Sequence, residues 1–265
     1  MPRWPTPKGQ TKNKKGPILG QIIHGDCLDI LSTLPKSSVD MVLTDLPYGS
    51  TACAWDAIIP FVPMWTLLSH VCKEKAAIVF FASQPFTTML ISSNFQIFKY
   101  CWTWEKNFST NFYHAKRMPL RRTEDLVVFY KTQPTYNPQR TSGHVPTQSA
   151  RGASDGVLYH GVNARDYAGG DTTRSPINIL RFDAVDPKNR LHPSQKPTEL
   201  LAYLIRTYSD CGDTVLDFAA GSCSTAVAAR NEGRNFICIE KETKYVDLAR
   251  KRLSMPVVRQ EQLEK

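Results

Sequence analysis

The stretch that most limits the fold of this chain is AAIVFFAS, from Ala76 to Ser83, which is apolar almost without interruption. Such a run is typical of a parallel strand that is covered on both faces. Apolar residues at helical spacing precede it over residues 60–73, and a short helix that opens at Pro85 and reaches about Ser93 follows it. A buried strand between two helices predicts an α/β fold with a doubly wound, mostly parallel sheet.

The same alternation recurs at both ends of the chain. Residues 19–26 are predicted as a strand, 27–34 as a helix and 39–43 as the next strand, which makes one βαβ unit. In the last third, a helix from about Thr198 precedes two further strand, loop and helix units over residues 214–253. A length of 265 residues favours one α/β domain with an inserted or appended subdomain over two full domains.

Polar and aromatic residues follow the predicted strand 39–43. Because Pro47 stops the apolar run, Asp45 to Tyr48 are expected just past the carboxyl end of the strand, where open α/β sheets bind ligands. The carboxylate of Asp45 and the carbonyl of Leu46 can accept hydrogen bonds from an exocyclic amino group, and Tyr48 can stack on a flat base. A plain strand-to-turn junction with a solvated acid is the alternative.

A glycine-containing turn lies between the last two predicted strands. Gly221 and Ser222 lead into a helix, and such a turn lets the backbone approach a ligand and present free N–H groups to it. Glu240 follows Gly221 by 19 residues, close to the separation at which a βαβ unit places an acid on ribose hydroxyls. Because G-x-G-x-x-G is absent, a glycine turn beside a solvated acid is the alternative, and a nicotinamide-dependent dehydrogenase is disfavoured.

Positive charge points to nucleic acid as a partner. The formal net charge is +9, which suggests a polyanionic partner. Residues 99–122 combine basic and aromatic side chains, as in a groove that holds an unstacked nucleotide and its phosphates. The alternation of Tyr100, Trp102 and Trp104 also fits the buried face of a strand. We assign candidate DNA contacts to Lys106, Lys116, Arg117, Arg121, Arg122, Arg140 and Arg151.

Residues 131–190 interrupt the α/β pattern. They are rich in Gly, Pro, Thr, Asn, Gln and Arg and poor in periodic apolar residues. A connection of this length is either functional or disordered, and we expect a target-recognition insertion that orders on DNA rather than a passive linker. It would separate a catalytic half, residues 19–130, from a cofactor-binding half, residues 191–254. A basic mobile arm, residues 1–18, and a tail, residues 255–265, complete the chain.

Composition narrows the cellular setting. The seven cysteines include no C-x-x-C pair and no neighbouring histidine at metal-ligand spacing, which predicts reduced thiols and no metal site. No apolar stretch approaches the roughly 20 residues that span a bilayer. The basic amino terminus has no apolar core of a secretory signal. The sequence therefore predicts a cytoplasmic protein without a membrane partner.

Five short motifs resemble those of the amino-directed DNA methyltransferases, which methylate adenine N6 or cytosine N4. They are GD at Gly25–Asp26, DLPYG at Asp45–Gly49, HPSQKP at His192–Pro197, LDFAAGS at Leu216–Ser222 and IE at Ile239–Glu240. The catalytic motif comes first and the cofactor loop last, which is similar to the permuted β group of that family. This resemblance, over about residues 19–254, implies a class I S-adenosylmethionine-dependent methyltransferase fold, Rossmann-like, with an inserted DNA-recognition region.

The resemblance also implies roles for individual residues. Asp45, Leu46 and Tyr48 would hold and activate the target amino group. Pro47 would fix their loop, because a residue before proline is held extended. The cofactor, S-adenosylmethionine, would contact Asp26 with its adenine, Glu240 with its ribose, and Ser194, Lys196, Asp217, Phe218, Ala219, Gly221 and Ser222 with its methionine part.

Some residues depart from the family pattern. Leu46 stands where proline is usual, and Phe218 and Ala219 replace the usual Pro and Phe. Cys223 stands where a second glycine is usual, and it would add a side chain next to the cofactor.

The implied reaction is methyl transfer from S-adenosylmethionine to adenine N6 in double-stranded DNA, on a base flipped out of the duplex. Aspartate rather than serine at position 45 favours adenine over cytosine N4. Two alternatives stay open: another target, cytosine N4 or an RNA base, and a DNA-binding protein that has lost catalysis through Leu46 and Cys223. A homodimer and a cognate restriction endonuclease also stay open as partners, because many relatives belong to phages or restriction-modification systems.

Overall fold

The computed structural model describes residues 19–49, 56–148 and 169–254. Among these, residues 138–148 and 169–177 form a small compact unit, and the others form a larger one. The predicted arm and tail lie outside the described residues. No helix in the described ranges is long and apolar enough to cross a membrane.

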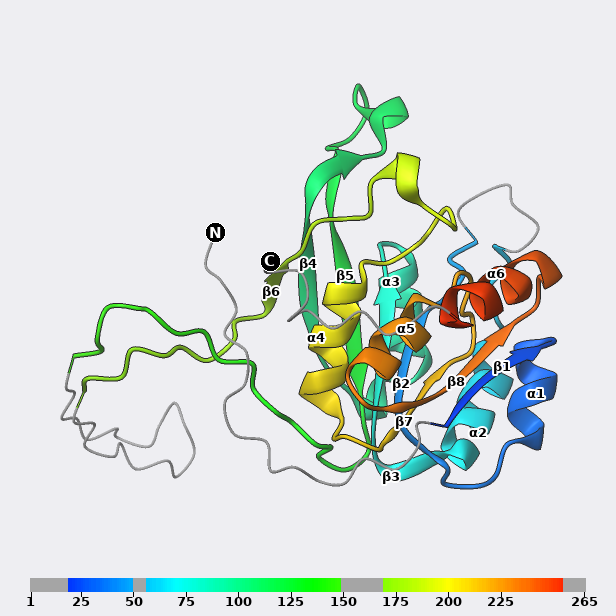
Figure 1. The fold of residues 1–265 in the computed structure, drawn as a ribbon. Coiled ribbons are helices and arrows are strands. Elements are labelled where there is room, and N and C mark those ends of the chain that lie inside the picture. The colour runs from blue at the N-terminus through cyan, green and yellow to red at the C-terminus, as the bar shows by residue number, and fades with distance from the viewer. Residues whose placement is uncertain (1–18, 50–55, 149–168, 255–265) are drawn as a thin grey trace. The chain divides into compact units, whose positions relative to one another are not determined.

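The larger unit is built on a sheet with the strand order β1-β8-β7-β2-β3-β5-β4-β6 (Figure 1). Its strands are β1 (Gly20–His24), β2 (Val39–Asp45), β3 (Cys72–Ala82), β4 (Phe98–Thr110), β5 (Arg121–Phe129), β6 (Ile179–Arg181), β7 (Thr214–Asp217) and β8 (Asn235–Glu240). Neighbours are parallel except around β5, which runs antiparallel to β3 and β4. Strands β2, β7 and β8 therefore bring their last residues, Asp45, Asp217 and Glu240, to one edge of the sheet.

Helices cover both faces of the sheet (Figure 1). They are α1 (Cys27–Thr33), α2 (Phe61–Val71), α3 (Phe86–Ser93), α4 (Thr198–Tyr208), α5 (Ser224–Asn231) and α6 (Thr243–Ser254). Successive side chains of β3 divide between the layers: Val79 and Phe81 pack with α4, α5 and α6, whereas Ile78 and Phe80 pack with α1, α2 and α3. This two-sided burial is why the β3 sequence is continuously apolar.

The predicted α/β fold class and the predicted order of helices and strands over residues 19–130 and 191–254 are confirmed. Two details differ. The apolar strand was expected from Ala76 between parallel neighbours, but β3 begins at Cys72 and pairs with antiparallel β5 on one side. Strand β6 was not predicted, because only Leu180 of its three residues is buried and no period can be recognised in so short a segment.

Strands β4 and β5 form a hairpin that extends beyond the other strands (Figure 1). The pairing register shifts between Glu105 and Thr110, so residues 106–109 leave the regular ladder. At the tip, the aromatic side chains of Phe112 and Tyr113 are exposed, Tyr113 completely. The predicted buried face of β4 is confirmed for Trp102 and Trp104, which are 4% and 2% exposed.

The small unit consists of two extended segments that lie side by side. Thr141 and Arg174 form an antiparallel bridge, and the amide N–H groups of His144 and Thr147 donate to the carbonyls of Thr172 and Asp171. These hydrogen bonds close the base of the predicted insertion, whose residues 149–168 lie outside the described chain.

A buried hydroxyl joins the hairpin to helix α4. Tyr208, 2% exposed, accepts a hydrogen bond from Trp102 Nε1 at 2.6 Å, and its hydroxyl lies 2.9 Å from that of Tyr100. Because an indole N–H is only a donor, Tyr208 is the group that satisfies Trp102 in the core.

We expect Tyr208→Phe to lower the free energy of unfolding by about 1–3 kcal/mol, since it leaves the buried Trp102 N–H without an acceptor. Urea unfolding followed by fluorescence measures the change. Tyr113→Phe is the matched control, because that hydroxyl lies on a fully exposed side chain. Equal unfolding midpoints for the two variants would contradict the expectation.

Candidate functional site

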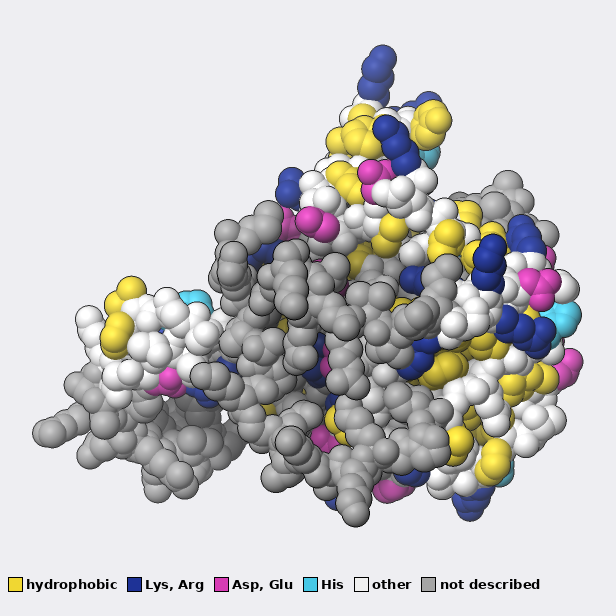
Figure 2. Space-filling view, in the orientation of Figure 1, with side chains coloured by type: hydrophobic (Ala, Val, Ile, Leu, Met, Phe, Trp, Pro, Cys, Tyr) yellow, Lys and Arg dark blue, Asp and Glu magenta, His cyan; other side chains and the backbone are white. Residues whose placement is uncertain are grey.

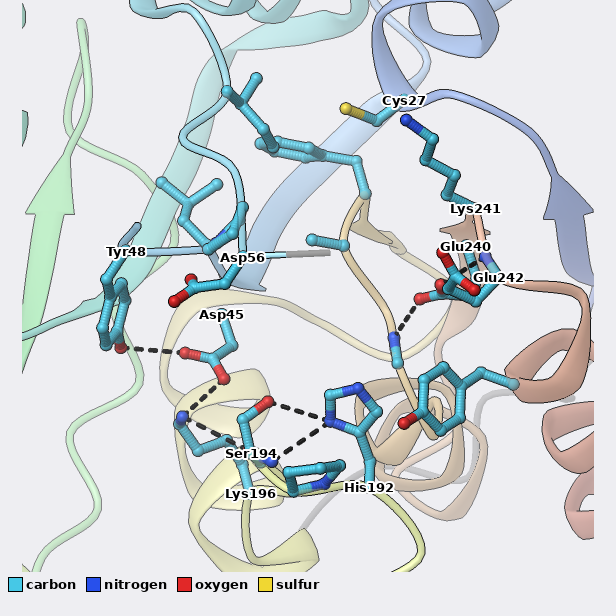
Figure 3. Close-up of a pocket in the computed structure, with 18 of the residues that line it drawn as sticks. Cys27, Asp45, Tyr48, Asp56, His192, Ser194, Lys196, Glu240, Lys241 and Glu242 are labelled. Atoms are coloured by element: carbon cyan, nitrogen blue, oxygen red, sulfur yellow. Dashed lines mark hydrogen bonds and ion pairs between the residues drawn. The ribbon is translucent and has the colours of Figure 1, made fainter. Parts of the chain in front are cut away.

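A cavity of about 470 Å³ opens at the carboxyl ends of the parallel strands. The residues after β1, β2, β7 and β8 line it together with the hairpin and the segment before α4. Figure 3 shows Asp45, Tyr48 and Lys196 on one side of it and Glu240 and Lys241 on another. The predicted catalytic motif and the predicted ribose-binding acid therefore share one cavity.

Both carboxylate oxygens of Asp45 have partners. Tyr48 Oη lies 2.9 Å from Oδ1, and Lys196 Nζ lies 2.6 Å from Oδ2 (Figure 3). The Lys196 ammonium also lies over the ring of Phe81, 4.9 Å from its centroid. The charged end of Lys196, a residue predicted at the methionine part of the cofactor, is therefore bound to Asp45.

A second acid, Glu124 of β5, lies beside Asp45. Its Oε1 atom is 2.8 Å from Tyr48 Oη and 3.2 Å from Lys196 Nζ, and its Oε2 atom is 2.8 Å from Lys106 Nζ. We call Asp45, Tyr48, Lys106, Glu124 and Lys196 the acid–lysine cluster. Its two carboxylates and two ammonium groups balance in charge, which is what burial of ionised side chains requires.

The two acids of the cluster differ in their surroundings. Burial raises the pKa of Asp45, the charge of Lys196 opposes this, and the charge of Glu124 adds to it, with a raised pKa as the result. For Glu124, the charges of Lys196 and Lys106 outweigh the effect of burial and hold the pKa at about 2. Burial and both acids raise the pKa of Tyr48, so its hydroxyl keeps its proton.

The other side of the cavity is acidic. Glu240 accepts hydrogen bonds from the backbone N–H of Gly221 at 2.6 Å and of Glu242 at 2.8 Å, which fixes its carboxylate at the wall (Figure 3). Asp26 also lines this side while its side chain caps α1 through the N–H of Leu28. These acids can accept hydrogen bonds from hydroxyl groups of a ligand.

The turn at Gly221 is tightly packed. Its φ is +50°, and a Cβ atom there would lie 3.3 Å from the ring of His192, which in turn packs edge-on against Tyr245. Glycine is therefore favoured here both by its backbone conformation and by the space available. Ser194 lies near this wall with its hydroxyl 3.0 Å from His192 Nδ1.

Other predicted cofactor residues divide between two cavities. Phe218 and Ala219 line the large one. Asp217 and Ser222 are buried, 4% and 3% exposed, and line a small cavity of about 30 Å³ instead.

The expectation that Cys223 adds a side chain next to the cofactor is wrong. Its side chain is fully buried, packs in the core beside Cys238, and lines neither cavity. Its backbone has φ 53° and ψ 41°, in the left-handed region that favours glycine. The glycine that is usual at this position in the family therefore suits a left-handed backbone conformation. Cysteine adopts the same conformation at a cost of about 1–2 kcal/mol in stability.

The candidate DNA contacts lie in three places. Lys116, Arg117, Arg121 and Arg122 lie on the exposed part of the hairpin, and Figure 2 shows Lys, Arg and hydrophobic side chains together at its tip. Lys106, by contrast, is part of the acid–lysine cluster. Arg140 forms an ion pair with Asp171 within the small unit, and Arg151 lies outside the described residues.

Sequence reasoning missed Glu124 and the site role of Lys106. The sequence did contain an indication for Glu124. It alternates with Leu126 and Val128 on one face of β5, which is buried, and a buried acid needs a partner. The sequence contained no such indication for Lys106, because the direction of its side chain depends on the register shift in β4.

Known proteins resemble this chain in sequence and fold. The family described as DNA methylase, which comprises N6 and N4 methyltransferases, matches residues 39–251. The DNA adenine methyltransferase YhdJ of Escherichia coli (strain K12) is 29% identical over 251 residues, 88% of this chain and 82% of that protein.

Two solved structures share the fold. The M1.HpyAVI–SAM complex has a TM-score of 0.59 at 23% identity, over 88% of this chain and 100% of the other. The cytosine-N4-specific PvuII DNA methyltransferase has a TM-score of 0.65 at 16% identity, over 92% and 90%. The fold is therefore that of the class I DNA methyltransferases. The family match extends over most of the chain, and the chain belongs to the N6/N4 DNA methylase family.

The buried Asp217 makes stability depend on pH. Burial raises its pKa from 3.8 to about 7. The pKa of Asp217 is therefore higher in the folded than in the unfolded protein. The neutral carboxyl group favours the folded state, and this contribution to the free energy of unfolding is fully present below about pH 4 and is lost as the pH rises through 7. Relative to Asp217→Asn, we expect the free energy of unfolding of the wild type to fall by roughly 3 kcal/mol between pH 4 and pH 8.

Urea unfolding across this range measures the difference. Asp247→Asn serves as the control, because that carboxylate is exposed on α6. Wild-type and Asp217→Asn stabilities that change in parallel with pH would contradict the assignment.

Proposed function

We propose that this protein transfers a methyl group from S-adenosylmethionine to adenine N6 of a base flipped out of duplex DNA. The observation that carries the proposal is the position of Asp45 and Tyr48 at the end of β2, in one cavity with the acidic wall around Glu240. An acceptor for an amino group beside a wall for a nucleoside-like cofactor can hold two ligands in position to react with each other.

The residues present fit S-adenosylmethionine. The cavity volume of about 470 Å³ is within the usual range for small-molecule sites. In this proposal Glu240 accepts from the ribose hydroxyls, Asp26 lies at the adenine, and Phe218, Ala219 and Gly221 surround the methionine part. The cofactor supplies a methyl group already activated by its bond to a sulfonium.

Protein groups bind and orient the target. The carboxylate of Asp45 and the carbonyl of Leu46 accept hydrogen bonds from the amino group, which directs the nitrogen lone pair toward the donor side. Tyr48 contacts the face of the base. Its ring already packs against Phe86, with ring centroids 5.1 Å apart, so its position is supported before the base arrives.

The hairpin tip supplies a surface for DNA. Lys116 and Arg117 can contact phosphates, and the exposed Phe112 and Tyr113 can contact bases. The hairpin also carries Lys106 and Glu124 of the acid–lysine cluster, so the proposed DNA contact and the cavity wall belong to the same two strands.

Cytosine N4 is the second candidate target. The similarity to the cytosine-N4-specific PvuII enzyme supports it, because both reactions use an amino group on a flat base. Aspartate at position 45 and the similarity to the adenine enzyme YhdJ support adenine.

One assay tests the proposal. The purified protein is incubated with unmethylated genomic DNA and methyl-labelled S-adenosylmethionine, and the DNA is digested to nucleosides. Label in N6-methyladenine is expected. Label in N4-methylcytosine would favour the second candidate, and DNA binding without label would favour a protein that has lost catalysis.

We expect Asp45→Asn to lower the rate of methyl transfer by roughly 10²–10⁴-fold, because the charged acceptor is lost. Affinity for S-adenosylmethionine, measured by calorimetry, should stay close to that of the wild type. Asp247→Asn removes an exposed carboxylate and is expected to retain activity. Turnover of Asp45→Asn at the wild-type rate would refute the role of Asp45.

The double variant Lys116→Ala/Arg117→Ala is expected to weaken DNA binding and to reduce the salt dependence by about one ion per lost phosphate contact. Affinity for S-adenosylmethionine should not change. Lys36→Ala/Lys75→Ala removes the same charge from exposed lysines near the amino ends of β2 and β3. Equal salt slopes for the two double variants would place the DNA surface elsewhere.

A further inference from the structure

The Tyr48 hydroxyl lies between two carboxylates. Its oxygen is 2.9 Å from Asp45 Oδ1 and 2.8 Å from Glu124 Oε1, both hydrogen-bond distances. A phenol has one proton, and an ionised carboxylate only accepts. With both acids ionised, one of these two contacts therefore lacks a hydrogen. The arrangement can take up one proton there without moving a heavy atom.

The surroundings decide which acid receives that proton. Glu124 contacts both lysines of the cluster, and their charges hold it ionised. Of the two lysines, Asp45 contacts Lys196, and it faces the negative charges of Glu124 and Asp217. Asp45 is also the more exposed of the two, with 17% of its side chain accessible against 7% for Glu124.

We propose that Glu124, acting through the Tyr48 hydroxyl, is a positioning residue that enables Asp45 to accept the proton released from the amino group during methyl transfer. This inference rests on the proposed amino methylation but holds for adenine and cytosine alike.

The amino nitrogen uses its lone pair to bond the methyl carbon, and the carbon–sulfur bond breaks with its electron pair going to sulfur. The nitrogen is then positively charged, and it gives one proton to Asp45. Asp45 Oδ1 donates that hydrogen to Tyr48 Oη, while Tyr48 donates its own to Glu124 Oε1. The proton later passes to water.

The two lysines have different tasks in this arrangement. Lys196 keeps Asp45 ionised before the reaction, since its ammonium lies 2.6 Å from Oδ2. Lys106 keeps Glu124 ionised from the opposite side and lies over the Trp104 ring, 4.8 Å from the centroid. Removing Glu124 or Lys196 therefore has opposite effects on the basicity of Asp45.

The test is the pH dependence of methyl transfer in a single turnover, measured with labelled S-adenosylmethionine on DNA. We expect the acidic limb to move to lower pH by roughly one unit in Glu124→Gln and to higher pH in Lys196→Gln. The plateau rate of Glu124→Gln should fall about tenfold or more. Glu105→Gln is the matched control, because Glu105 pairs with Arg181 outside the cavity, and it should change neither quantity.

A double variant tests whether the Tyr48 hydroxyl connects Asp45 and Glu124. If Tyr48 links the two acids, adding Glu124→Gln to Tyr48→Phe should cause no further loss of the plateau rate. If the losses of plateau rate in the two single variants multiply in the double variant, the connection through Tyr48 is wrong. An acidic limb that stays in place in both Glu124→Gln and Lys196→Gln would also overturn the proposal. Glu124→Asp keeps the charge and shortens the side chain. Glu124→Asp should lower the plateau rate of methyl transfer and leave the acidic limb of the pH profile in place. This variant therefore tests the proposal if Glu124→Gln does not fold.

A measurement without turnover separates this inference from the proposed function. Carboxyl-carbon NMR of ¹³C-labelled protein follows the titration of Asp45 directly, and its pKa should be lower in Glu124→Gln than in the wild type. No methyl transfer by the wild type would refute the proposed function. An Asp45 titration that is the same in both proteins would overturn the inference, whether or not DNA is methylated.

Discussion

The structure of the site depends on the pairing of four charges that are buried or largely buried. Removing an ionised carboxylate from water costs several kcal/mol unless partners replace the lost hydration. Here Asp45 and Glu124 are each matched by a lysine within hydrogen-bond distance. The partners come from β2, β4, β5 and the segment before α4, so the cluster can form only when these four segments meet. Assembly of the fold and ionisation of the acid are therefore linked.

This arrangement has a consequence for chemistry in the cavity. A lone buried aspartate would hold a proton and could not accept one from a ligand. A lone solvated aspartate would be ionised but would be a weak base. Burial raises the pKa of Asp45, Lys196 opposes this and Glu124 adds to it, so the carboxylate is more basic than that of a solvated aspartate. The basicity of Asp45 therefore depends largely on residues outside the Asp45–Tyr48 motif.

Local patterns predicted most of the fold and the place of the Asp45–Tyr48 loop at the end of a strand. Apolar runs and helical spacing are properties of neighbours in sequence, so β2, β3, α4 and β8 could be recognised, and so could Asp45 and Glu240 at strand ends. The roles of Lys196 and Lys106 could not, because they depend on contacts across 151 residues and across a register shift. Such contacts leave no period in the sequence.

The hydrogen bonds between the two segments of the small unit join parts of the chain that are far apart in sequence. The chain leaves the sheet after β5 and returns in β6, and the Thr141–Arg174 bridge joins the two paths between these points. Because the bridge holds these two paths together, the chain between them is a loop with fixed ends, and lengthening such a loop adds little to the entropy cost of closing it.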